Sequence, residues 1–262
     1  MKITNKLNLP GPIFDLISRD EYSRGNADIS VTQLIDSPRV RMMYKIHDDK
    51  MEIEASKLLA STLGRAFHKA IEVATKTGLA ENRFFAKVYG WTLSGGIDHF
   101  ENGIITDYKT ANVFKVVYSH HGTVEEWESQ LNVYAYLLRV NGHEVKELKI
   151  FVLFKDWNRR DFSSKKEKGN LWAPWKRSGY PDNDWAHINI PLWPESVVRL
   201  YIEERIKAHQ EAEKNLPECE PEETWRGKRC LSYCQAADWC EQFKKNRNKT
   251  FLVRKGILEE EE

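Results

Sequence analysis

The stretch GGIDHFENGIITDYKT, residues 95–110, decides the fold of this chain. Strand-like runs lie on both sides of Asn102-Gly103, and this dipeptide is the strongest short-range signal for a two-residue hairpin turn. The pattern therefore predicts a strand over residues 95–100, a turn, and a second strand over residues 103–109.

Two carboxylates and one ammonium group lie in this hairpin at positions that bring them together. Asp98 and Asp107 are nearly equidistant from the turn, so they face each other on adjacent strands. Asp107 and Lys109 are two residues apart, so their side chains point to the same face. Two carboxylates can hold a hard divalent cation, and an ammonium group beside them can act on a phosphate or on the attacking water. The trio indicates a metal-dependent site, with salt-bridging residues on a solvated strand face as the alternative.

The elements around the hairpin predict an α/β fold. Helices are predicted from apolar spacing over residues 55–77, 124–140 and 195–215. Further strands are predicted over residues 83–93, 148–154 and 186–192. The run LKIFVLF at residues 148–154 is continuously apolar, as expected of a strand that is buried on both faces. This order of elements favours a mixed sheet flanked by helices.

The same residues resemble the RecB-like branch of the PD-(D/E)XK nuclease superfamily. Residues 95–98 and 107–110 resemble its G-x-[IV]-D and D-[YF]-K-T strands, residues 64–68 its G-x-x-x-H helix, and residues 130–134 its Q-x-x-x-Y helix. Residues 30–34 and 37–39 resemble its usual opening. The resemblance extends from about residue 29 to residue 240. It implies a restriction-endonuclease-like core with a C-terminal Cys-rich tail.

The resemblance also implies roles for individual residues. The catalytic residues that it implies are Asp98, Asp107, Lys109, Gln130 and Tyr134. The ligands that it implies for Mg²⁺ or Mn²⁺ are His68, Asp98, Asp107 and the carbonyl group of Tyr108. Glu81 is a secondary candidate, or only a charge in a loop. Taken alone, His68 could be structural, and Gln130 and Tyr134 could simply pack on the sheet.

All four cysteines lie near the C-terminus, at Cys219, Cys230, Cys234 and Cys240. In a reducing cytoplasm such a group binds metal more often than it forms disulfides. Many RecB-like nucleases hold a [4Fe–4S] cluster with one distant N-terminal cysteine and a C-terminal C-x2-C-x5-C. Here the C-terminal group has x3 in place of x2, and Ser37 stands at the N-terminal position, so Cys219 is the candidate fourth ligand. We expect a [4Fe–4S] cluster, with Zn²⁺ or unliganded thiols as alternatives.

Residues 156–183 are predicted to form a long polar and aromatic loop. From residue 159 to residue 177 it carries seven basic residues against two acidic ones, a net charge of +5, with indole rings interleaved. Basic residues neutralise phosphates and indoles stack on unpaired bases, so the loop is a candidate DNA contact, or else only a solvated loop. The candidate contact residues are Arg159, Arg160, Lys165, Lys166, Trp172, Trp175, Lys176 and Arg177.

The bulk composition is that of a folded globular protein. The 262 residues are 41% hydrophobic and 30% charged, and the net charge of +1 does not by itself indicate a partner. Neither a membrane span nor a secretory signal is recognisable, so we expect a cytoplasmic protein. We expect three regions: a helical or extended segment over residues 1–54 that packs on the core, a nuclease core over residues 55–216, and a Cys-rich metal-binding tail over residues 217–262.

These observations predict a divalent-metal-dependent deoxyribonuclease. We expect an exonuclease that acts on DNA ends or single strands in recombination, repair or phage replication, with DNA as its partner and no membrane association. A site-specific endonuclease is the alternative within the same class. From other classes, a non-catalytic DNA-binding module that retains the nuclease fold and a redox carrier built on the cysteines stay open.

Overall fold

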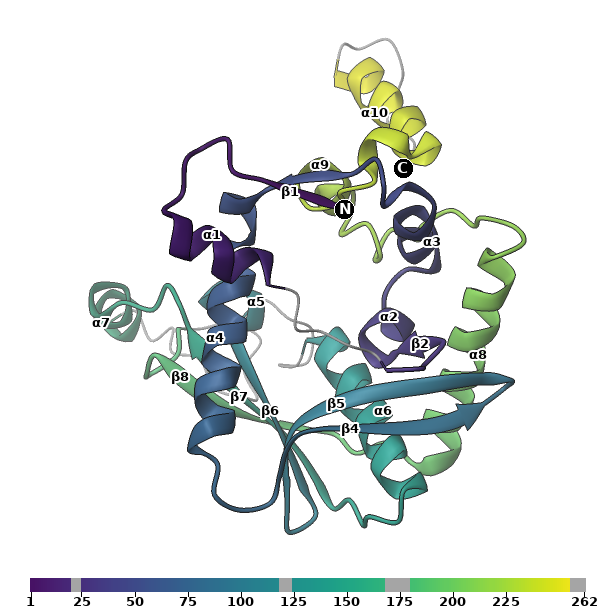
Figure 1. Cartoon of the computed structure of the whole chain (residues 1–262). Helices are drawn as coiled ribbons and strands as arrows, with labels where there is room; N and C mark the ends of the chain where they lie inside the picture. The colour runs from purple at the N-terminus through teal and green to yellow at the C-terminus, as the bar shows by residue number, and fades with distance from the viewer. Residues whose placement is uncertain (20–24, 118–123, 168–179, 255–262) are drawn as a thin grey trace. The chain divides into compact units, whose positions relative to one another are not determined.

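The computed structural model describes residues 1–19, 25–117, 124–167 and 180–254, the last seven of these by their backbone alone. The chain divides into two compact units (Figure 1). The smaller unit comprises Met1–Glu21, Asp36–Leu59 and Arg205–Glu262, and the larger one comprises Tyr22–Ile35 and Ala60–Glu204. The three regions expected from the sequence stay a prediction.

The larger unit is built on a sheet, which has six strands within the described residues. The strands are β2 (Ile29–Ser30), β4 (Leu79–Val88), β5 (Trp91–Glu101), β6 (Ile104–Ala111), β7 (Glu147–Phe154) and β8 (Trp185–Ile190). The helices are α2 (Val31–Ile35), α4 (Leu59–Ala74), α5 (Val113–Val117), α6 (Glu125–Val140), α7 (Arg159–Glu167) and α8 (Glu195–Ala212). Helices α4 and α8 run across the boundary between the units.

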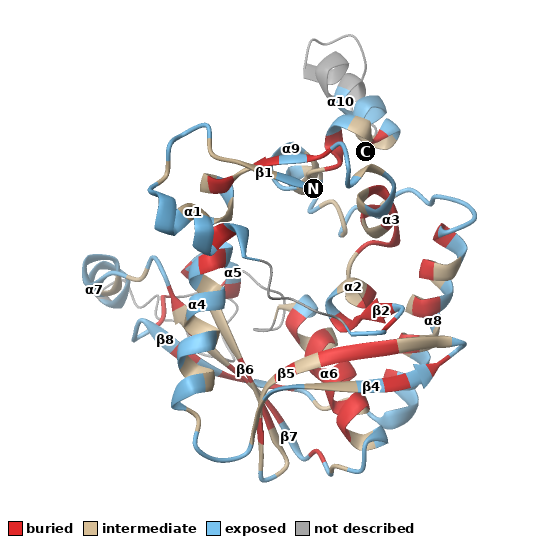
Figure 2. Cartoon of the chain, in the orientation of Figure 1, coloured by how far each residue is buried: buried red, intermediate tan, exposed pale blue. Residues whose placement is uncertain are grey.

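The sheet is mixed, as predicted. β5 pairs antiparallel with β4 and β6, β7 pairs parallel with β6 and antiparallel with β8, and β2 pairs parallel with β5. Helices cover both faces of β6, because Lys109 donates a hydrogen bond to Gln130 of α6 while the next residue, Thr110, lies against Gly64 of α4. Figure 2 shows that buried residues follow the middle of β5 and the length of α6. The predicted mixed sheet flanked by helices is therefore confirmed.

The hairpin at Asn102-Gly103 is confirmed, but the predicted strand over residues 83–93 is wrong. Asn102 and Gly103 both have positive φ, at 52° and 84°, as the tight hairpin turn requires. A second turn of the same kind, at Tyr89-Gly90 with φ of 48° and 82°, divides the predicted strand into β4 and β5. Tyrosine rarely adopts positive φ, so the dipeptide gave no turn signal.

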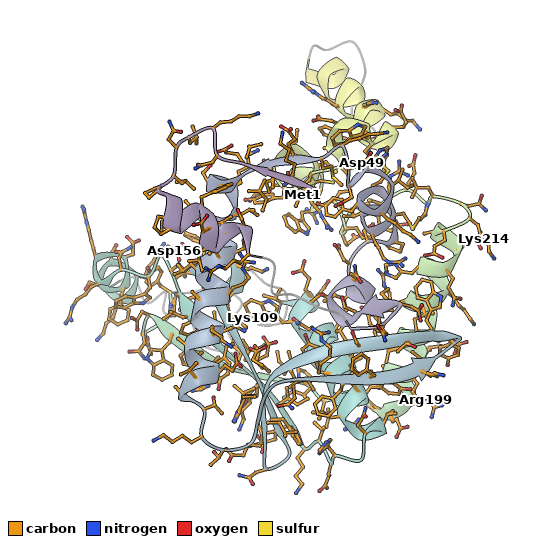
Figure 3. The ribbon with its side chains drawn as sticks, in the orientation of Figure 1. Met1, Asp49, Lys109, Asp156, Arg199 and Lys214 are labelled. Atoms are coloured by element: carbon orange, nitrogen blue, oxygen red, sulfur yellow. The ribbon has the colours of Figure 1, made fainter. Side chains whose placement is uncertain are left out.

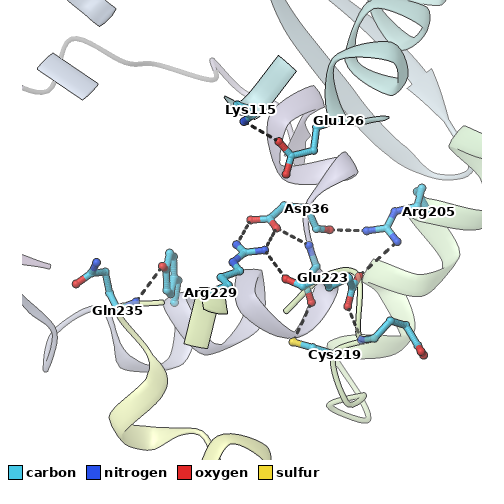
Figure 4. A network of polar contacts seen from close by, with 11 residues as sticks. Asp36, Lys115, Glu126, Arg205, Cys219, Glu223, Arg229 and Gln235 are labelled. Carbon is cyan, nitrogen blue, oxygen red and sulfur yellow. Dashed lines mark hydrogen bonds and ion pairs between the residues drawn. The ribbon is translucent and has the colours of Figure 1, made fainter. Parts of the chain in front are cut away.

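The smaller unit joins segments that are far apart in the sequence. Its elements are β1 (Lys2–Thr4), α1 (Gly11–Ser18), α3 (Pro38–His47), β3 (Glu52–Glu54), the 3-10 helix η1 (Ala55–Leu58), α9 (Lys228–Ser232), the 3-10 helix η3 (Ala237–Trp239) and α10 (Glu241–Arg254). Strands β1 and β3 pair in parallel. The carboxylate of Asp36 accepts hydrogen bonds at 2.6 and 2.8 Å from both terminal nitrogens of Arg229 (Figure 4), a bidentate geometry that fixes orientation as well as distance.

In the parts of the chain that the structure describes, no helix combines the length and the apolar character needed to cross a membrane.

Gly95 and Gly96 offer a direct test of how closely α6 packs on the sheet. A Cβ on Gly95 would lie 2.8 Å from atoms of both Tyr134 and Leu137, whereas a Cβ on Gly96 would meet only the mobile guanidinium end of Arg83 at 3.4 Å. We expect Gly95→Ala to lower the free energy of unfolding by about 1–3 kcal/mol because the helix must move. The matched Gly96→Ala should change it far less. Urea denaturation measures both, and equal losses would contradict the close packing of α6.

Candidate metal and nuclease centre

The candidate centre lies where β5 and β6 separate. Their ladder runs from the turn to the pair His99–Thr106 and goes no further, and the two strands then diverge (Figure 1). In place of the next ladder contact, Oδ2 of Asp98 accepts a hydrogen bond of 2.8 Å from the backbone N–H of Tyr108. Extended by one step, the register of this ladder places Asp98 opposite Asp107, as predicted, but the strands are no longer paired there and leave a gap.

Three potential metal ligands from three elements converge at this gap. Nδ1 of His68, on α4, lies 3.4 Å from Oδ2 of Asp98 and 3.6 Å from Oε1 of Glu81. One donor atom from each residue lies within 4.8 Å of those of the other two. The structure therefore brings Glu81 into the ligand group, although the sequence made it only a secondary candidate.

Glu81 adopts an unusual backbone conformation for a residue inside a strand. Its φ is +53° at the third position of β4, between the pairs Ala80–His99 and Asn82–Ile97, which flank Asp98 on the neighbouring strand. Strain of this kind is found at functional sites that the surrounding structure stabilises, and here it accompanies two carboxylates and an imidazole.

His68 holds a proton firmly in this arrangement. Hydrogen bonds to Asp98 and then to Glu81 raise the pKa of His68 from 6.5 to about 10, and burial opposes that rise. A metal ion can bind the imidazole only after it has lost this proton. Metal binding at this group must therefore release a proton over much of the neutral and mildly alkaline range.

The second half of the centre is a chain of polar contacts behind Asp107. Lys109 Nζ lies 2.7 Å from Asp107 Oδ2 and donates a 3.0 Å hydrogen bond to Oε1 of Gln130, whose amide donates a 2.8 Å hydrogen bond to Tyr134 Oη. Figure 3 labels Lys109 on its strand. Asp107, Lys109, Gln130 and Tyr134 are thus brought together as predicted from the sequence, and α6 supplies the last two.

Asp107 is the most deeply buried member of the centre. It is 1% exposed, and burial raises its pKa from 3.8 to about 6, while Lys109 lowers that pKa and Asp98 raises it. In the described residues the ammonium group of Lys109 is the charge that compensates this carboxylate, 2.7 Å from its Oδ2. A buried carboxylate needs such compensation, and a second cation would add to it.

The residues present fit a divalent metal ion. Carboxylate oxygens and a neutral imidazole are ligands that Mn²⁺ accepts, and Mg²⁺ prefers the oxygens. His68, Glu81 and Asp98 supply converging donors, and Asp107 supplies a buried oxygen close by. Tyr108 gives its N–H to Asp98, and coordination through its carbonyl group stays a prediction.

The four cysteines line a single pocket in the smaller unit. Arg39, Arg229 and Met43 are also part of its wall. The thiol of Cys219 lies 3.3 Å from the hydroxyl of Ser37, and the buried Arg39 donates from Nε to Cys240 Sγ at 3.3 Å. Sequence reasoning missed the Arg39 contact, because nothing in the local pattern links residues 201 positions apart.

Burial raises the pKa of three of these thiols. The pKa of Cys219 rises to about 11, mainly by burial, with opposition from the Ser37 hydrogen bond, and the pKa values of Cys230 and Cys234 also rise by burial. Each of these two is raised further by a neighbouring cysteine. Closely spaced thiols in a low-dielectric pocket stay protonated until a cation compensates their charge.

The predicted loop over residues 156–183 is partly helical. Within it, α7 carries Arg159, Arg160, Lys165 and Lys166, all exposed. Trp172, Trp175, Lys176 and Arg177 lie outside the described residues. The prediction of DNA contact by this segment stays a prediction.

Comparisons with known proteins give distant similarity only. No protein-family model matches the chain, and no curated protein is significantly similar to it. The crystal structure of SSO0001 is 17% identical, with 87% of this chain and 92% of that chain covered and a TM-score of 0.49. A candidate exonuclease from Eubacterium rectale is 12% identical (76% and 71% covered, TM-score 0.35), and a phage-related exonuclease from Haemophilus somnus 129PT is 13% identical (76% and 75% covered, TM-score 0.31). At this distance, function has to be argued from the residues of the chain itself.

The raised pKa of His68 gives a pH-dependent prediction. In the metal-free protein, the stabilisation from its proton is complete below about pH 6.5 and is lost as the pH rises toward about 10. Mn²⁺ must displace this proton, so the increase in melting temperature caused by Mn²⁺ should grow as the pH rises through that window. In His68→Gln the Mn²⁺ effect should be small and nearly independent of pH, whereas His143→Gln, which removes a histidine packed between Phe84 and Phe100, should behave like wild type. A wild-type Mn²⁺ effect that is flat with pH would rule out His68 as a ligand.

Proposed function

We propose that this chain is a divalent-metal-dependent deoxyribonuclease of the PD-(D/E)XK type, an exonuclease that acts on DNA ends or single strands in recombination, repair or phage replication. One observation carries the proposal. The buried Asp107–Lys109 pair lies at the strand gap where His68, Glu81 and Asp98 converge. The carboxylates and the imidazole are suited to bind a metal cation, and Lys109 beside them presents its own positive charge.

The chain's own residues have distinct tasks in this proposal. His68, Glu81 and Asp98, with Asp107, would hold the metal ion. A bound divalent ion lowers the pKa of a water ligand and polarises a phosphoryl oxygen. Lys109 presents its ammonium group to the negative charge that develops on the phosphate during hydrolysis. Gln130 accepts a hydrogen bond from Lys109, and Tyr134 accepts one from Gln130, so these two fix where that ammonium group sits.

A purely structural role for these charges is the weaker interpretation. A buried ion pair contributes little net stability, and apolar residues of similar volume often stabilise the fold more. Asp107 is buried and its pKa is raised even though Lys109 lies 2.7 Å away, so the arrangement costs free energy. Strongly perturbed carboxylates beside a lysine and a metal-ligand group are typical of catalytic centres. This favours the enzyme over the non-catalytic DNA-binding module.

We further propose that Cys219, Cys230, Cys234 and Cys240 bind a [4Fe–4S] cluster that stabilises the smaller unit. All four line one pocket. Thiolate sulfur is a ligand both of iron–sulfur clusters and of Zn²⁺, and the resemblance to nucleases that hold a [4Fe–4S] cluster favours the cluster. The cation of Arg39 at Cys240 offsets thiolate charge.

The nuclease proposal is tested with a pair of lysine variants. Lys109 lies 2.7 Å from Asp107, and Lys149 on the next strand lies 2.7 Å from Glu147 with the same spacing in sequence. We expect Lys109→Ala and Asp107→Asn to lower the rate of Mg²⁺- or Mn²⁺-dependent DNA hydrolysis by about 100-fold or more, the order expected when a transition-state contact is lost. Lys149→Ala should leave it unchanged.

Linear, circular and end-blocked DNA serve as substrates, so that exonuclease and endonuclease action are separated. Circular dichroism checks that each variant is folded. Wild-type rates in Lys109→Ala, or equal losses in Lys149→Ala, would contradict the assignment of the centre.

The cluster proposal is tested by moving one ligand. Because Ser37 and Cys219 touch at 3.3 Å, a thiol at position 37 reaches nearly the same point of the pocket as Cys219. We expect anaerobically purified Cys219→Ser to lose most of its iron and its broad absorbance at about 400 nm, which thiolate-ligated iron–sulfur clusters show, and Ser37→Cys/Cys219→Ser to regain both. A colourless wild type with about one equivalent of zinc would contradict the cluster and support Zn²⁺. Iron retained in Cys219→Ser would remove Cys219 from the ligand set.

A further inference from the structure

Aromatic side chains from three neighbouring strands of the larger unit form a continuous stripe across one face of the sheet. Tyr108 on β6 is paired with Phe151 on β7, and Phe151 is paired with His187 on β8. Their ring centroids are 6.2 Å and 5.3 Å apart, and Trp185 lies 6.0 Å from Phe151 and 5.5 Å from His187. We call these four residues the aromatic stripe.

The outer half of the aromatic stripe is exposed. Along β8, Ala186, Ile188 and Ile190 are buried, whereas the residues between them face outward. Trp185 is 43% exposed, and His187 is exposed as well. A large indole on an open strand face adds little to the core, and such rings are typical of surfaces that contact a partner.

The inner end of the aromatic stripe lies beside the metal-ligand group of the candidate centre. Lys109 contacts α6, so the ring of the preceding residue, Tyr108, points to the opposite face of the sheet, where Thr110 lies against Gly64 of α4. The N–H of Tyr108 donates to Asp98, and burial and then the charge of Asp98 raise the pKa of its phenol. The aromatic stripe therefore runs from beside Asp98 to the exposed edge of the sheet.

The segment that leads into the outer end of the aromatic stripe is tied to the start of a basic helix. Helix α7 begins just after Trp157 and Asn158, and both are tied to the segment that leads into β8. Trp157 Nε1 donates to the carbonyl oxygen of Pro181, and the backbone N–H of Asn158 donates to Tyr180 Oη, each at 2.9 Å. Arg159, Arg160, Lys165 and Lys166 of α7 are exposed (Figure 1 shows the helix).

We propose that the aromatic stripe is a base-stacking surface for a nucleic-acid strand whose phosphate lies at the nuclease centre. The proposal rests on the proposed function. Aromatic rings accept the face of any base, and neighbouring lysines and arginines neutralise the phosphates between them. The aromatic stripe supplies the rings, helix α7 supplies basic residues, and the inner end of the stripe lies beside Asp98, which would hold the metal ion. The aromatic stripe therefore receives unpaired bases, whatever their sequence.

The test measures binding without cleavage. In EDTA, fluorescence anisotropy compares a labelled oligothymidine of about 15 nucleotides, within the range of single-strand site sizes, with an abasic oligomer that has the same number of phosphates. We expect wild type to bind the oligothymidine at least about fivefold more tightly, since stacking contributes at least about 1 kcal/mol per base. In Trp185→Ala this preference should fall several-fold toward one, and Trp185→Phe should retain most of it.

Phe85→Ala is the matched control. Phe85 is 41% exposed on β4 of the same sheet, close to the exposure of Trp185, but lies outside the aromatic stripe. It should leave the preference for bases unchanged. His187→Ala provides a second test of the same surface if Trp185→Ala does not fold. A wild type without preference for bases, or a preference that survives in Trp185→Ala and His187→Ala, would overturn the proposal.

Failure of this proposal and failure of the proposed function are distinguishable. Hydrolysis is assayed separately with Mg²⁺ or Mn²⁺. A chain that cuts DNA while Trp185→Ala keeps the preference for bases would have the nuclease centre but not the stacking surface. A chain that prefers bases through Trp185 but never cuts DNA would have the surface without the activity.

Discussion

The hydrogen bond from the backbone N–H of Tyr108 to the carboxylate of Asp98 is the contact on which the larger unit's centre depends. A sheet that opens leaves backbone donors without partners, and an unpaired buried N–H costs about as much as a lost hydrogen bond. Asp98 supplies the missing acceptor from its side chain. Asp98 thereby compensates the backbone donor that is exposed where β5 separates from β6. The same carboxylate lies beside His68.

The same gap sets the electrostatic problem that the neighbouring residues solve. Asp98, Asp107 and Glu81 bring three carboxylates close together, and like charges so close cannot all stay ionised without compensation. In the structure the compensation comes from a protonated His68 on one side and from Lys109 on the other. A divalent cation would relieve the repulsion, release the proton of His68 and leave Lys109 available to a phosphate. The charge arrangement is therefore stable in a protonated state and prepared for a metal-bound one.

The sequence predicted the structural features that local patterns determine, and it did not predict those that depend on tertiary contacts. Asn102-Gly103 predicted its hairpin because both residues tolerate positive φ, while Tyr89-Gly90 makes the same kind of turn with a residue that gives no such signal. Lys109 and Gln130 were both named as candidates, but their hydrogen bond depends on how α6 lies on the sheet. From the sequence, Glu81 was only a possible loop charge. The structure places it in strand β4 with a positive φ, which the local pattern does not predict. The contact of Ser37 with Cys219 spans 182 positions, which no spacing rule covers.

The donor atoms of the two units differ in softness, and this difference determines which metal ions each unit is suited to bind. His68, Glu81 and Asp98 offer one nitrogen and carboxylate oxygens, which suit Mn²⁺ and, through the oxygens, Mg²⁺. The pocket in the smaller unit offers four sulfur atoms, which suit iron–sulfur clusters and Zn²⁺ and hold Mg²⁺ poorly. Zn²⁺ binds nitrogen and oxygen sites more tightly than Mn²⁺ does, so affinity alone would favour it in the larger unit as well. Thiolates bind soft ions far better than carboxylates do, so the pocket of four cysteines and the carboxylate centre are suited to different metal ions.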